Sequence, residues 1–336
     1  MKIVLTGHTG FKGSWFSVML KEYGHDLYGF SLKPVANGLF KNANLSALYS
    51  KESYSDIRDE RQLEKFCMKA NADLIIHFAA QPLVRYSYRN PEETFSVNVN
   101  GTLNVLKTAE VCDSVSKVLV ITTDKVYRNL EERRPFVETD PLGGSDPYST
   151  SKAMADLLAD SWGKSVSKKQ ILIGRAGNVI GGGDFAEDRL IPDLYRSYQV
   201  KTKPTLRNPE SVRPWQHVLD CLNGYRRLIE LSEQKPLSNA WNFGPEAKDY
   251  RTVREVTKGF QQNLGAGEWA EVPDNTMHEA GFLTLDSSKA FNELNWHNKL
   301  DFENSVNWTA DWYKAIHNNQ DFYKITIQQT KEFLSI

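Results

Sequence analysis

Short apolar runs alternate with stretches of helical periodicity between residues 2 and 173. Apolar runs bounded by turn residues are typical of buried strands, and apolar positions that recur every three to four residues are typical of helices. The runs predict strands near 2–5, 26–30, 73–78, 118–121 and 171–173, and the periodic stretches predict helices near 15–23, 60–70, 91–113 and 149–165. This alternation predicts an α/β chain with a Rossmann-type doubly wound parallel sheet.

The length of the chain indicates more than one structural unit, because 336 residues exceed a typical single domain. We expect a dinucleotide-binding domain at residues 1–176 plus roughly 214–246. A smaller, interleaved C-terminal α/β domain, at residues 177–213 plus 247–336, is expected to bind the substrate. Apolar residues make up 40% of the chain, which is enough to supply a core for both.

Charge and cysteine content narrow the function classes further. The formal net charge of −1 argues against nucleic acid as the main partner. No apolar run of the sequence is long enough to span a bilayer, and the first glycine turn comes too early to leave room for a signal peptide. Cys67, Cys112 and Cys221 match no metal-binding spacing, so no metal site is predicted. We therefore expect a protein of the reducing cytoplasm without a membrane partner.

Three glycines, Gly7, Gly10 and Gly13, separate the first predicted strand from the first predicted helix in a GxxGxxG spacing. Gly7 permits a tight turn, Gly10 lets the backbone approach a pyrophosphate, and Gly13 permits close packing of helix on strand. The N-terminus of the helix then offers free N–H groups to phosphates. A purely structural turn is the alternative, but the position between strand and helix favours a dinucleotide site.

Residues at the ends of the next strands bear on the choice of cofactor. An acidic residue after the second strand usually binds the adenosine ribose of NAD, but Ser31 and Lys33 occupy that region here. Lys33 could accept the 2′-phosphate of NADP. Asp56 either accepts a hydrogen bond from adenine or caps the following helix. Ala79 and Ala80 would let a cofactor lie close to the backbone.

Tyr148 and Lys152 stand four residues apart, which places both side chains on one face of a helix that Asp146-Pro147 can start. A neighbouring ammonium favours phenolate over phenol, so we expect Lys152 to lower the pKa of Tyr148 from about 10. Tyr148 could then take a proton from a substrate hydroxyl while hydride leaves the same carbon. The alternative is a partly buried tyrosine beside a solvated lysine.

Thr123, Asp124 and Lys125 come directly after the predicted strand at 118–121. Open α/β sheets bind ligands just beyond the carboxyl ends of their parallel strands, so this polar cluster is well placed to do chemistry. His77 also ends a predicted strand, but its apolar neighbours are typical of a histidine that is satisfied within the core.

Three arginines follow in the second half of the chain: Arg189, Arg207 and Arg213. Guanidinium groups bind phosphates through forked hydrogen bonds, so these residues could hold a second diphosphate together with Asn178. Taken alone, each arginine would be interpreted as a surface residue.

The strand–helix alternation, the glycine turn and the Tyr148–Lys152 pair together resemble the extended short-chain dehydrogenase/reductases. Within them, the chain resembles the CDP-glucose 4,6-dehydratases of the NAD-dependent epimerase/dehydratase family. The blocks that carry this resemblance are 6–15, 77–85, 122–125, 140–144, 175–184, 213–218 and 240–245.

The resemblance implies an NAD-dependent internal redox reaction on CDP-glucose. Hydride leaves carbon 4, water is eliminated across carbons 5 and 6, and hydride returns to carbon 6, which gives CDP-4-dehydro-6-deoxyglucose. Tyr148 is implied as the base at the 4-hydroxyl, with Lys152 lowering its pKa and holding the nicotinamide ribose. Thr123 would hydrogen-bond the 4-oxygen, and Asp124 would protonate the leaving 6-hydroxyl. Lys125 stands where related dTDP-sugar dehydratases carry the glutamate that removes the carbon-5 proton, and a lysine can do so when it is neutral.

The resemblance also implies two sets of binding residues. The implied cofactor-binding residues are Gly7, Gly10, Phe11, Lys12, Gly13, Asp56, Ile57, Ala79, Ala80, Tyr148 and Lys152. The implied substrate-binding residues are Gln81, Arg85, Asn178, Arg189, Arg207, Arg213 and His217. NAD is the expected cofactor, with NADP left open by Ser31 and Lys33, and the cytosine base rests on the resemblance alone.

The helices near 91–113 and 149–165 resemble the pair that family members use for a four-helix contact, so we expect a homodimer or a dimer of dimers. Two other functions stay open at this stage. A nucleotide-sugar epimerase on the same scaffold would need no acid at carbon 6, and a non-catalytic cofactor-sensing protein would need neither Tyr148 nor Lys152.

Overall fold

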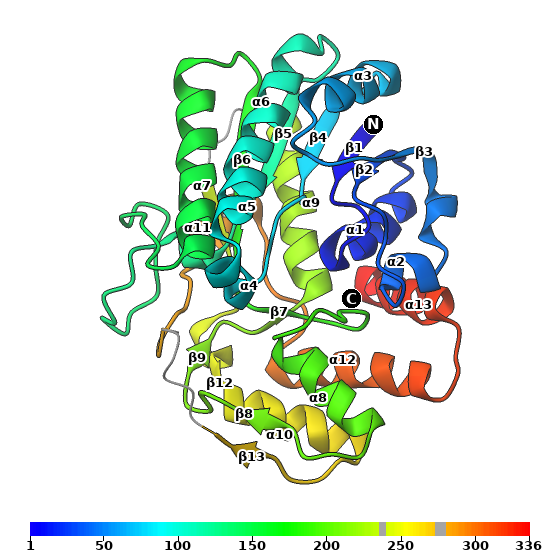
Figure 1. Ribbon diagram of the computed structural model, residues 1–336, viewed down its shortest axis with the longest axis vertical. Helices are drawn as coiled ribbons and strands as arrows, with labels where there is room; N and C mark the ends of the chain where they lie inside the picture. Colours follow the sequence, from blue (N-terminus) through cyan, green and yellow to red (C-terminus); the bar gives the residue numbers. More distant parts are fainter. Residues whose placement is uncertain (235–239, 273–279) are drawn as a thin grey trace.

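A parallel sheet of seven strands forms the centre of the molecule (Figure 1). The computed structural model describes residues 1–234, 240–272 and 280–336. The strands lie in the order β11-β6-β5-β4-β1-β2-β3, and the chain reverses its direction of travel across the sheet between β1 and β4. Their bounds are β1 (Lys2–Thr6), β2 (Asp26–Ser31), β3 (Tyr49–Tyr54), β4 (Leu74–His77), β5 (Lys117–Ile121), β6 (Gln170–Ala176) and β11 (Ala240–Phe243). The predicted Rossmann-type, doubly wound α/β fold is therefore confirmed.

The side chains of each strand alternate between two apolar layers, because successive residues of a strand point to opposite faces. In β1, Ile3 and Leu5 pack into one layer, whereas Val4 packs into the other. The first layer is covered by α1 (Phe11–Glu22), α9 (Val218–Gln234) and α13 (Phe322–Ser335). The second is covered by α3 (Glu60–Ala70), α6 (Gly101–Val111) and α7 (Pro147–Ser165).

The edge strand β3 is largely polar, so it is not among the strands that the apolar runs predict. Ser50, Lys51 and Glu52 interrupt any hydrophobic run there, and half of the strand is open to solvent. β3 pairs in this sheet with β2 alone, so it does not need two buried faces. Short elements join the larger ones: α2 (Leu39–Asn42), η1 (Leu45–Leu48), α4 (Val84–Arg89), η3 (Asp124–Val126) and η4 (Ala247–Asp249).

The helix predicted near 91–113 is present as three successive helical segments, the middle one of which is π-helical. α5 (Pro91–Phe95) runs into a π-helical segment, η2 (Ser96–Asn100), before α6 begins. Asn98, in the π-helical segment, accepts a hydrogen bond from the backbone nitrogen of Gln81 at 2.8 Å and donates to Ser151 Oγ at 2.9 Å. The π-helical turn thus joins the end of β4 to α7.

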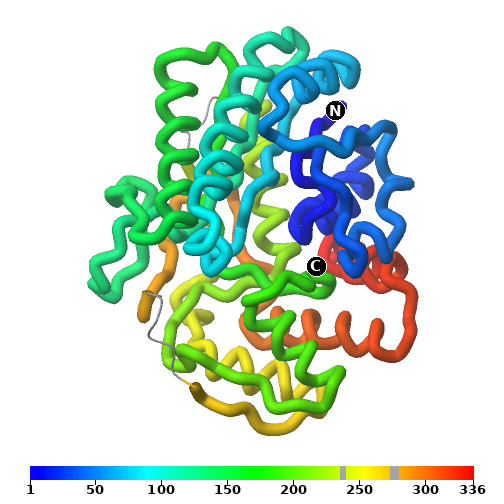
Figure 2. Tube along the Cα trace, in the orientation of Figure 1, coloured from blue at the N-terminus to red at the C-terminus, as the bar shows by residue number. Residues whose placement is uncertain are grey.

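The remaining elements gather below the sheet, at the bottom of Figure 1. Three short two-stranded ladders lie there: β7 (Val179–Ile180) with β10 (Gln216–His217), β9 (Val212–Arg213) with β12 (Arg251–Thr252), and β8 (Thr205–Leu206) with β13 (Ala270–Glu271). Helices accompany them: α8 (Leu190–Gln199), α10 (Val253–Leu264) and α12 (Phe302–His317). α11 (Ser288–Leu294) packs on α9 and β11, and α13 returns to α1, so the red α13 lies beside the blue α1 in Figure 2.

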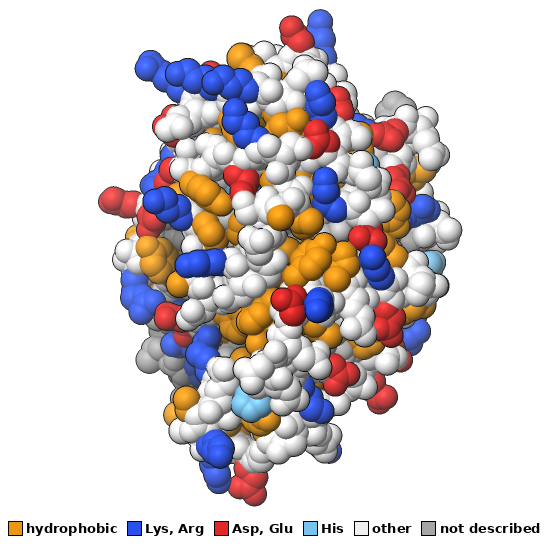
Figure 3. All heavy atoms as spheres, turned by 90° about the vertical axis from the view of Figure 1, so that its right-hand side faces the viewer, with side chains coloured by type: hydrophobic (Ala, Val, Ile, Leu, Met, Phe, Trp, Pro, Cys, Tyr) orange, Lys and Arg blue, Asp and Glu red, His pale blue; other side chains and the backbone are white. Residues whose placement is uncertain are grey.

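Charges of both signs are interspersed over the face shown in Figure 3. Within the described parts of the chain, no helix combines the length and hydrophobicity that a membrane span requires. The same residues contain no cluster of three or more histidine, cysteine, aspartate or glutamate side chains arranged to hold a metal ion.

Candidate active site

Glycine shapes the turn between β1 and α1. Gly7 has a φ of +72°, a left-handed conformation that glycine adopts at no steric cost. A Cβ on Gly7 would lie 2.5 Å from the backbone nitrogen of Ala79, and a Cβ on Gly13 would lie 2.5 Å from the carbonyl oxygen of Gly7. Backbone packed this closely at a helix N-terminus is what a dinucleotide pyrophosphate requires, so the turn fits such a cofactor.

Of the two interpretations of Asp56, the structure excludes the helix cap. Asp59, not Asp56, caps α3, because its side chain accepts a hydrogen bond from the first turn of that helix. Arg58 instead donates to Asp56 at 2.6 and 2.9 Å, and these hydrogen bonds lower the pKa of the Asp56 carboxyl. Arg58 lines the cavity together with Ser31 and Lys33. It is a second cation beside Lys33, and the sequence analysis missed it.

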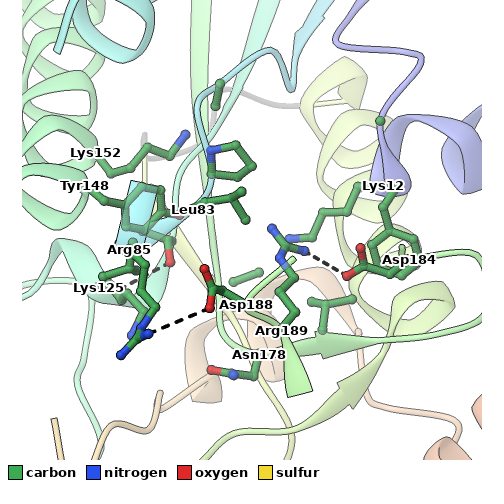
Figure 4. Close-up of a pocket in the computed structure, with 18 of the residues that line it drawn as sticks. Lys12, Leu83, Arg85, Lys125, Tyr148, Lys152, Asn178, Asp184, Asp188 and Arg189 are labelled. Atoms are coloured by element: carbon green, nitrogen blue, oxygen red, sulfur yellow. Dashed lines mark hydrogen bonds and ion pairs between the residues drawn. The ribbon is translucent and has the colours of Figure 1, made fainter. Parts of the chain in front are cut away.

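Tyr148 and Lys152 lie on one face of α7 and project toward the cavity (Figure 4). Asp146 starts this helix by accepting a hydrogen bond from the backbone nitrogen of Ser149 at 2.9 Å. Lys152 is buried and donates through Nζ to the carbonyl oxygen of Ile121 at 2.8 Å. Burial lowers the pKa of Lys152 to about 8. The alternative of a solvated lysine is therefore wrong.

The expected direction of the Tyr148 pKa is also wrong for this chain. Burial of the phenol raises the pKa of Tyr148 to about 12, although the Thr123 hydrogen bond and the charge of Arg189 both oppose the rise. A phenol removed from water strongly disfavours its anion, and here this effect exceeds that of the neighbouring cations.

Asp124 lines the cavity just beyond the end of β5. Its side chain is 2% exposed, and Oδ1 accepts a hydrogen bond from Thr123 Oγ1 at 2.9 Å. Oδ2 has no hydrogen-bond partner among the described residues. Burial raises the pKa of Asp124, with Lys125 as the largest opposing charge. A carboxyl group in this state is suited to donate a proton.

Behind these groups lies a buried network that the sequence analysis missed. Asp156, one helical turn beyond Lys152, accepts from Thr122 Oγ1 at 2.8 Å and from Arg175 at 2.6 and 2.9 Å. Arg175 also donates to the hydroxyl of Tyr127 at 2.9 Å. The network ties the helix that carries Tyr148 to the ends of β5 and β6. The signal in the sequence is an arginine within an otherwise apolar strand.

Arg189 and Arg207 reach the cavity paired with carboxylates from the segment between β7 and α8, and Figure 4 shows the first of these pairs. Arg189 Nη1 lies 3.0 Å from Asp184 Oδ2, and Arg207 Nη1 lies 3.2 Å from Asp188 Oδ1. The pKa of Arg189 is raised chiefly by the charge of Asp184. Arg213 is buried, and it donates to backbone carbonyl oxygens.

Aromatic residues from both ends of the chain hold this segment in place. Trp15 Nε1 donates to the carbonyl oxygen of Gly182 at 2.8 Å, and the hydroxyl of Tyr313 donates to the carbonyl oxygen of Asp184. The rings of Trp312 and Phe185 pack with centroids 6.2 Å apart. The segment that carries Asp184 is therefore fixed by α1 and α12 together.

Two predicted substrate residues do not line the cavity. Gln81 donates to Thr94 Oγ1 at 2.8 Å and accepts from the backbone nitrogen of Leu83 at 2.6 Å, so its amide is used within the fold. His217 is fully buried between the rings of Trp15 and Trp308, and burial lowers its pKa to about 3. Neither side chain therefore contributes to the lining of the cavity.

His77 is a core histidine, as predicted. Its ring nitrogens lie 2.8 Å from Thr6 Oγ1 and 3.2 Å from Thr102 Oγ1, and burial lowers its pKa to about 3.

One cavity of about 1380 Å³ brings the other predicted residues together. They are Gly7, Gly10, Phe11, Lys12, Gly13, Asp56, Ile57, Ala79, Ala80, Arg85, Thr123, Asp124, Lys125, Tyr148, Lys152, Asn178, Arg189, Arg207 and Arg213. The cavity thus brings together a glycine turn, a tyrosine, an acid, three lysines and a group of arginines. Such an arrangement can hold a dinucleotide and a second anionic ligand with a proton donor and a proton acceptor between them.

The sequence profile of the NAD dependent epimerase/dehydratase family matches residues 3–244. The chain belongs to this family. Among its relatives, a CDP-glucose 4,6-dehydratase of Salmonella typhimurium is 39% identical over 347 aligned residues, which cover 99% of this chain and 96% of the relative. A dTDP-glucose 4,6-dehydratase of Mycobacterium tuberculosis is 28% identical and covers 94% of this chain and 93% of its own.

Solved structures of the epimerase/dehydratase family superpose over nearly the whole chain. The dTDP-glucose 4,6-dehydratase of Bacillus anthracis, crystallised in complex with NAD, has a TM-score of 0.81 and 25% identity, covering 97% of this chain and 99% of its own. A UDP-glucose-4-epimerase of Stenotrophomonas maltophila has a TM-score of 0.84 at 20% identity, covering 95% of this chain and 99% of its own. The second likeness concerns the fold alone.

Proposed function

We propose that this protein is a CDP-glucose 4,6-dehydratase that converts CDP-glucose to CDP-4-dehydro-6-deoxyglucose and water. The observation that carries the proposal is the buried Asp124 carboxyl, which lines the same cavity as Tyr148 and Lys125 and whose Oδ2 has no hydrogen-bond partner among the described residues. An acid at this position is useful for expelling a hydroxyl group and unnecessary for simple epimerisation. The 39% identity to the Salmonella typhimurium enzyme over 99% of this chain supports the same substrate.

NAD is the proposed cofactor. The glycine turn at 7–13 would hold its pyrophosphate, and the small residues Ala79 and Ala80 would let it lie against the end of β4. When bound, NAD supplies the hydride acceptor and donor that makes the reaction redox-neutral overall. Lys152, fixed by the carbonyl oxygen of Ile121, would hold the ribose next to the reacting ring.

Proton removal from the 4-hydroxyl falls to Tyr148. Its phenol has a pKa of about 12 because it is buried, so cationic groups in the loaded site must favour the phenolate for the step to proceed near neutral pH. Thr123 donates its hydroxyl hydrogen to Asp124 and can also contact the 4-oxygen. Tyr148 would receive the proton, leaving carbon 4 as a ketone.

Elimination of water follows at carbons 5 and 6. The ketone acidifies the carbon-5 proton, and Lys125, in its neutral form, would remove it. Asp124, protonated because its pKa is raised by burial, would give its proton to the leaving 6-hydroxyl. One proton is taken and one is given in this step, so the sugar loses one molecule of water. Completion would then require a hydride at carbon 6, which bound NAD would supply, and a proton at carbon 5, which Lys125 would return. The proton that Tyr148 took from the 4-hydroxyl would replace the one that Asp124 gave, so the protein is unchanged overall.

The arginines would bind the diphosphate of the nucleotide sugar. Arg189, Arg207 and Arg213 line the same cavity as the glycine turn, and guanidinium groups match phosphate oxygens in forked geometry. The choice of cytosine is supported by the Salmonella typhimurium relative.

An assay with CDP-, dTDP-, UDP- and GDP-glucose tests the proposal. We expect the alkaline absorbance of a 4-keto-6-deoxy sugar with CDP-glucose, at a kcat/KM well above those of the other three. Interconversion of the carbon-4 epimers without loss of water would instead indicate an epimerase, and no turnover of any sugar would reject both activities.

We also propose a homodimer, or a dimer of dimers, formed through α5–α6 and α7. Met154 and Leu157 on α7 are 44% and 53% exposed, and η2 and α6, which pack against α7, carry the half-buried Val99 and Leu103. An apolar stripe across two adjacent helices suits burial against a second copy. A cytoplasmic location is proposed as well, because the three cysteines are free thiols.

A further inference from the structure

One wall of the cavity carries a carboxylate between two arginines. Asp188 Oδ1 lies 3.2 Å from Arg207 Nη1 and 4.0 Å from Arg85 Nη1 (Figure 4). Arg85 belongs to α4 and Arg207 follows β8, so this carboxylate joins segments that are far apart in the sequence. All three side chains keep between 24% and 31% of their surface exposed, so an incoming anion can reach them.

The backbone of Asp188 places this carboxylate. Its φ is +57°, in the left-handed region that few residues other than glycine adopt and that aspartate and asparagine tolerate best. The preceding Glu187 is exposed and has a negative φ, and it lies outside the cavity lining. Two neighbouring acidic residues therefore differ in whether they face the arginines.

A carboxylate and a phosphate offer the same forked pair of oxygens to a guanidinium group. We propose that Asp188 is an internal counter-ion for Arg85 and Arg207, displaced from them by the diphosphate of the nucleotide sugar. This inference rests on the proposed function only in requiring a nucleoside diphosphate as the ligand. Asp188 holds the two arginines within reach of each other, and its negative charge opposes every anion that enters.

Substrate and product carry the same diphosphate, so Asp188 weakens the binding of both by the same factor. Uniform weakening of this kind raises KM without slowing the chemical step, and it speeds the departure of product. Asp188 is thus a positioning residue that sets affinity, and the groups that touch the reacting carbons are unaffected by it.

Calorimetric titration of the NAD-saturated protein with CDP tests the inference without requiring turnover. Asp188→Asn keeps the left-handed backbone and removes the charge, and we expect it to bind CDP about two- to fivefold more tightly, the contribution of one partly exposed ionic contact. Glu187→Gln removes the neighbouring charge and should leave the Kd of CDP unchanged. Equal or weaker binding by Asp188→Asn, or the same gain in Glu187→Gln, overturns the proposal.

A second pair of variants tests whether the diphosphate displaces Asp188 from Arg207, or whether the charge of Asp188 merely repels any anion. Arg207→Gln should weaken CDP binding, and adding Asp188→Asn to it should recover less than half of the gain seen in the wild-type background, because the released partner is missing. If Asp188→Asn increases CDP affinity as much in the Arg207→Gln background as in the wild type, the proposed displacement of Asp188 is overturned. If UDP or dTDP binds in place of CDP and shows the same gain in Asp188→Asn, the base named in the proposed function is wrong while the counter-ion role is supported.

Discussion

The glycine turn at 7–13 and the arginine segment at 184–213 face the same cavity but are built by different forces. In the glycine turn the backbone itself is the constraint: a Cβ on Gly7 or Gly13 would lie within 2.5 Å of another backbone atom. In the arginine segment the constraint is pairing, because Arg189 and Arg207 are each held by a carboxylate. Steric limits on backbone are visible in a sequence, whereas the partner of an arginine is not.

The largest effect is expected at Tyr148, where the two regions meet. Tyr148→Phe removes the proton acceptor and keeps the ring, so kcat should fall by about a hundredfold to ten-thousandfold. The Kd of NAD, measured by fluorescence titration, should stay within twofold of the wild type because the ring still fills its place. A mutant that turns over CDP-glucose at a near-normal rate would remove Tyr148 from the mechanism.

Lys125 distinguishes dehydration from oxidation alone. Lys125→Met cannot remove the carbon-5 proton, so product formation should slow by about a hundredfold while oxidation at carbon 4 continues. Rapid mixing with CDP-glucose should then show the absorbance of reduced nicotinamide persisting on the enzyme. Product formed at the wild-type rate, with solvent deuterium still entering at carbon 5, would show that another group is the base.

Gly13→Ala tests the glycine turn by itself. The added methyl group meets backbone atoms that cannot move aside, so the affinity for NAD should fall at least about tenfold, equivalent to ~1.4 kcal/mol. The Kd of CDP should not change. Gly267→Ala is a matched control, because its Cβ would meet no atom within 4 Å. Normal NAD affinity in Gly13→Ala would contradict the steric account of the turn.

Arg189→Gln is the complementary change in the arginine segment. Loss of its guanidinium should raise the KM for the nucleotide sugar by about tenfold, as expected for a charge-assisted contact with phosphate, and should leave NAD affinity intact. If NAD affinity falls instead, the two regions do not bind separate ligands.

The smallest effect on chemistry is expected on the outer face of α7. Leu157→Asp should shift the assembly toward the monomer in sedimentation, since a charge would have to be buried in the interface. Lys164→Asp, also exposed on α7 but near its end, is the control. A wild-type protein that sediments as a monomer at micromolar concentration would reject the dimer itself.

The sequence predicts most of the glycine turn and its strands but only part of the arginine segment, because only local constraints leave a pattern in the sequence. Buried parallel strands must be apolar, and the turn after β1 must be glycine, so both are visible as local patterns. The polar strand β3 carries no such pattern. Asp156 and Arg175 stabilise each other across the core, and neither residue identifies the other in the sequence.

His217 illustrates the opposite case, a residue that the sequence associates with the site but that lies in the core. It stands in a sequence block that resembles a nucleotide-sugar enzyme, yet its ring packs against Trp15, more than 200 positions earlier in the chain. A residue type can be typical of a site while its side chain is used by the core, and only the packing separates the two cases.

The contacts of residues 182–184 carry a consequence for how the protein is made. This segment is held by Trp15, near the start of the chain, and by Tyr313, close to its end. Domains form during synthesis in the order in which their residues leave the ribosome. The strands beside the glycine turn can pair early, whereas the hydrogen bond from Tyr313 to the carbonyl oxygen of Asp184 forms only after residue 313 has been added. The last contacts of residues 182–184 therefore form near the end of synthesis.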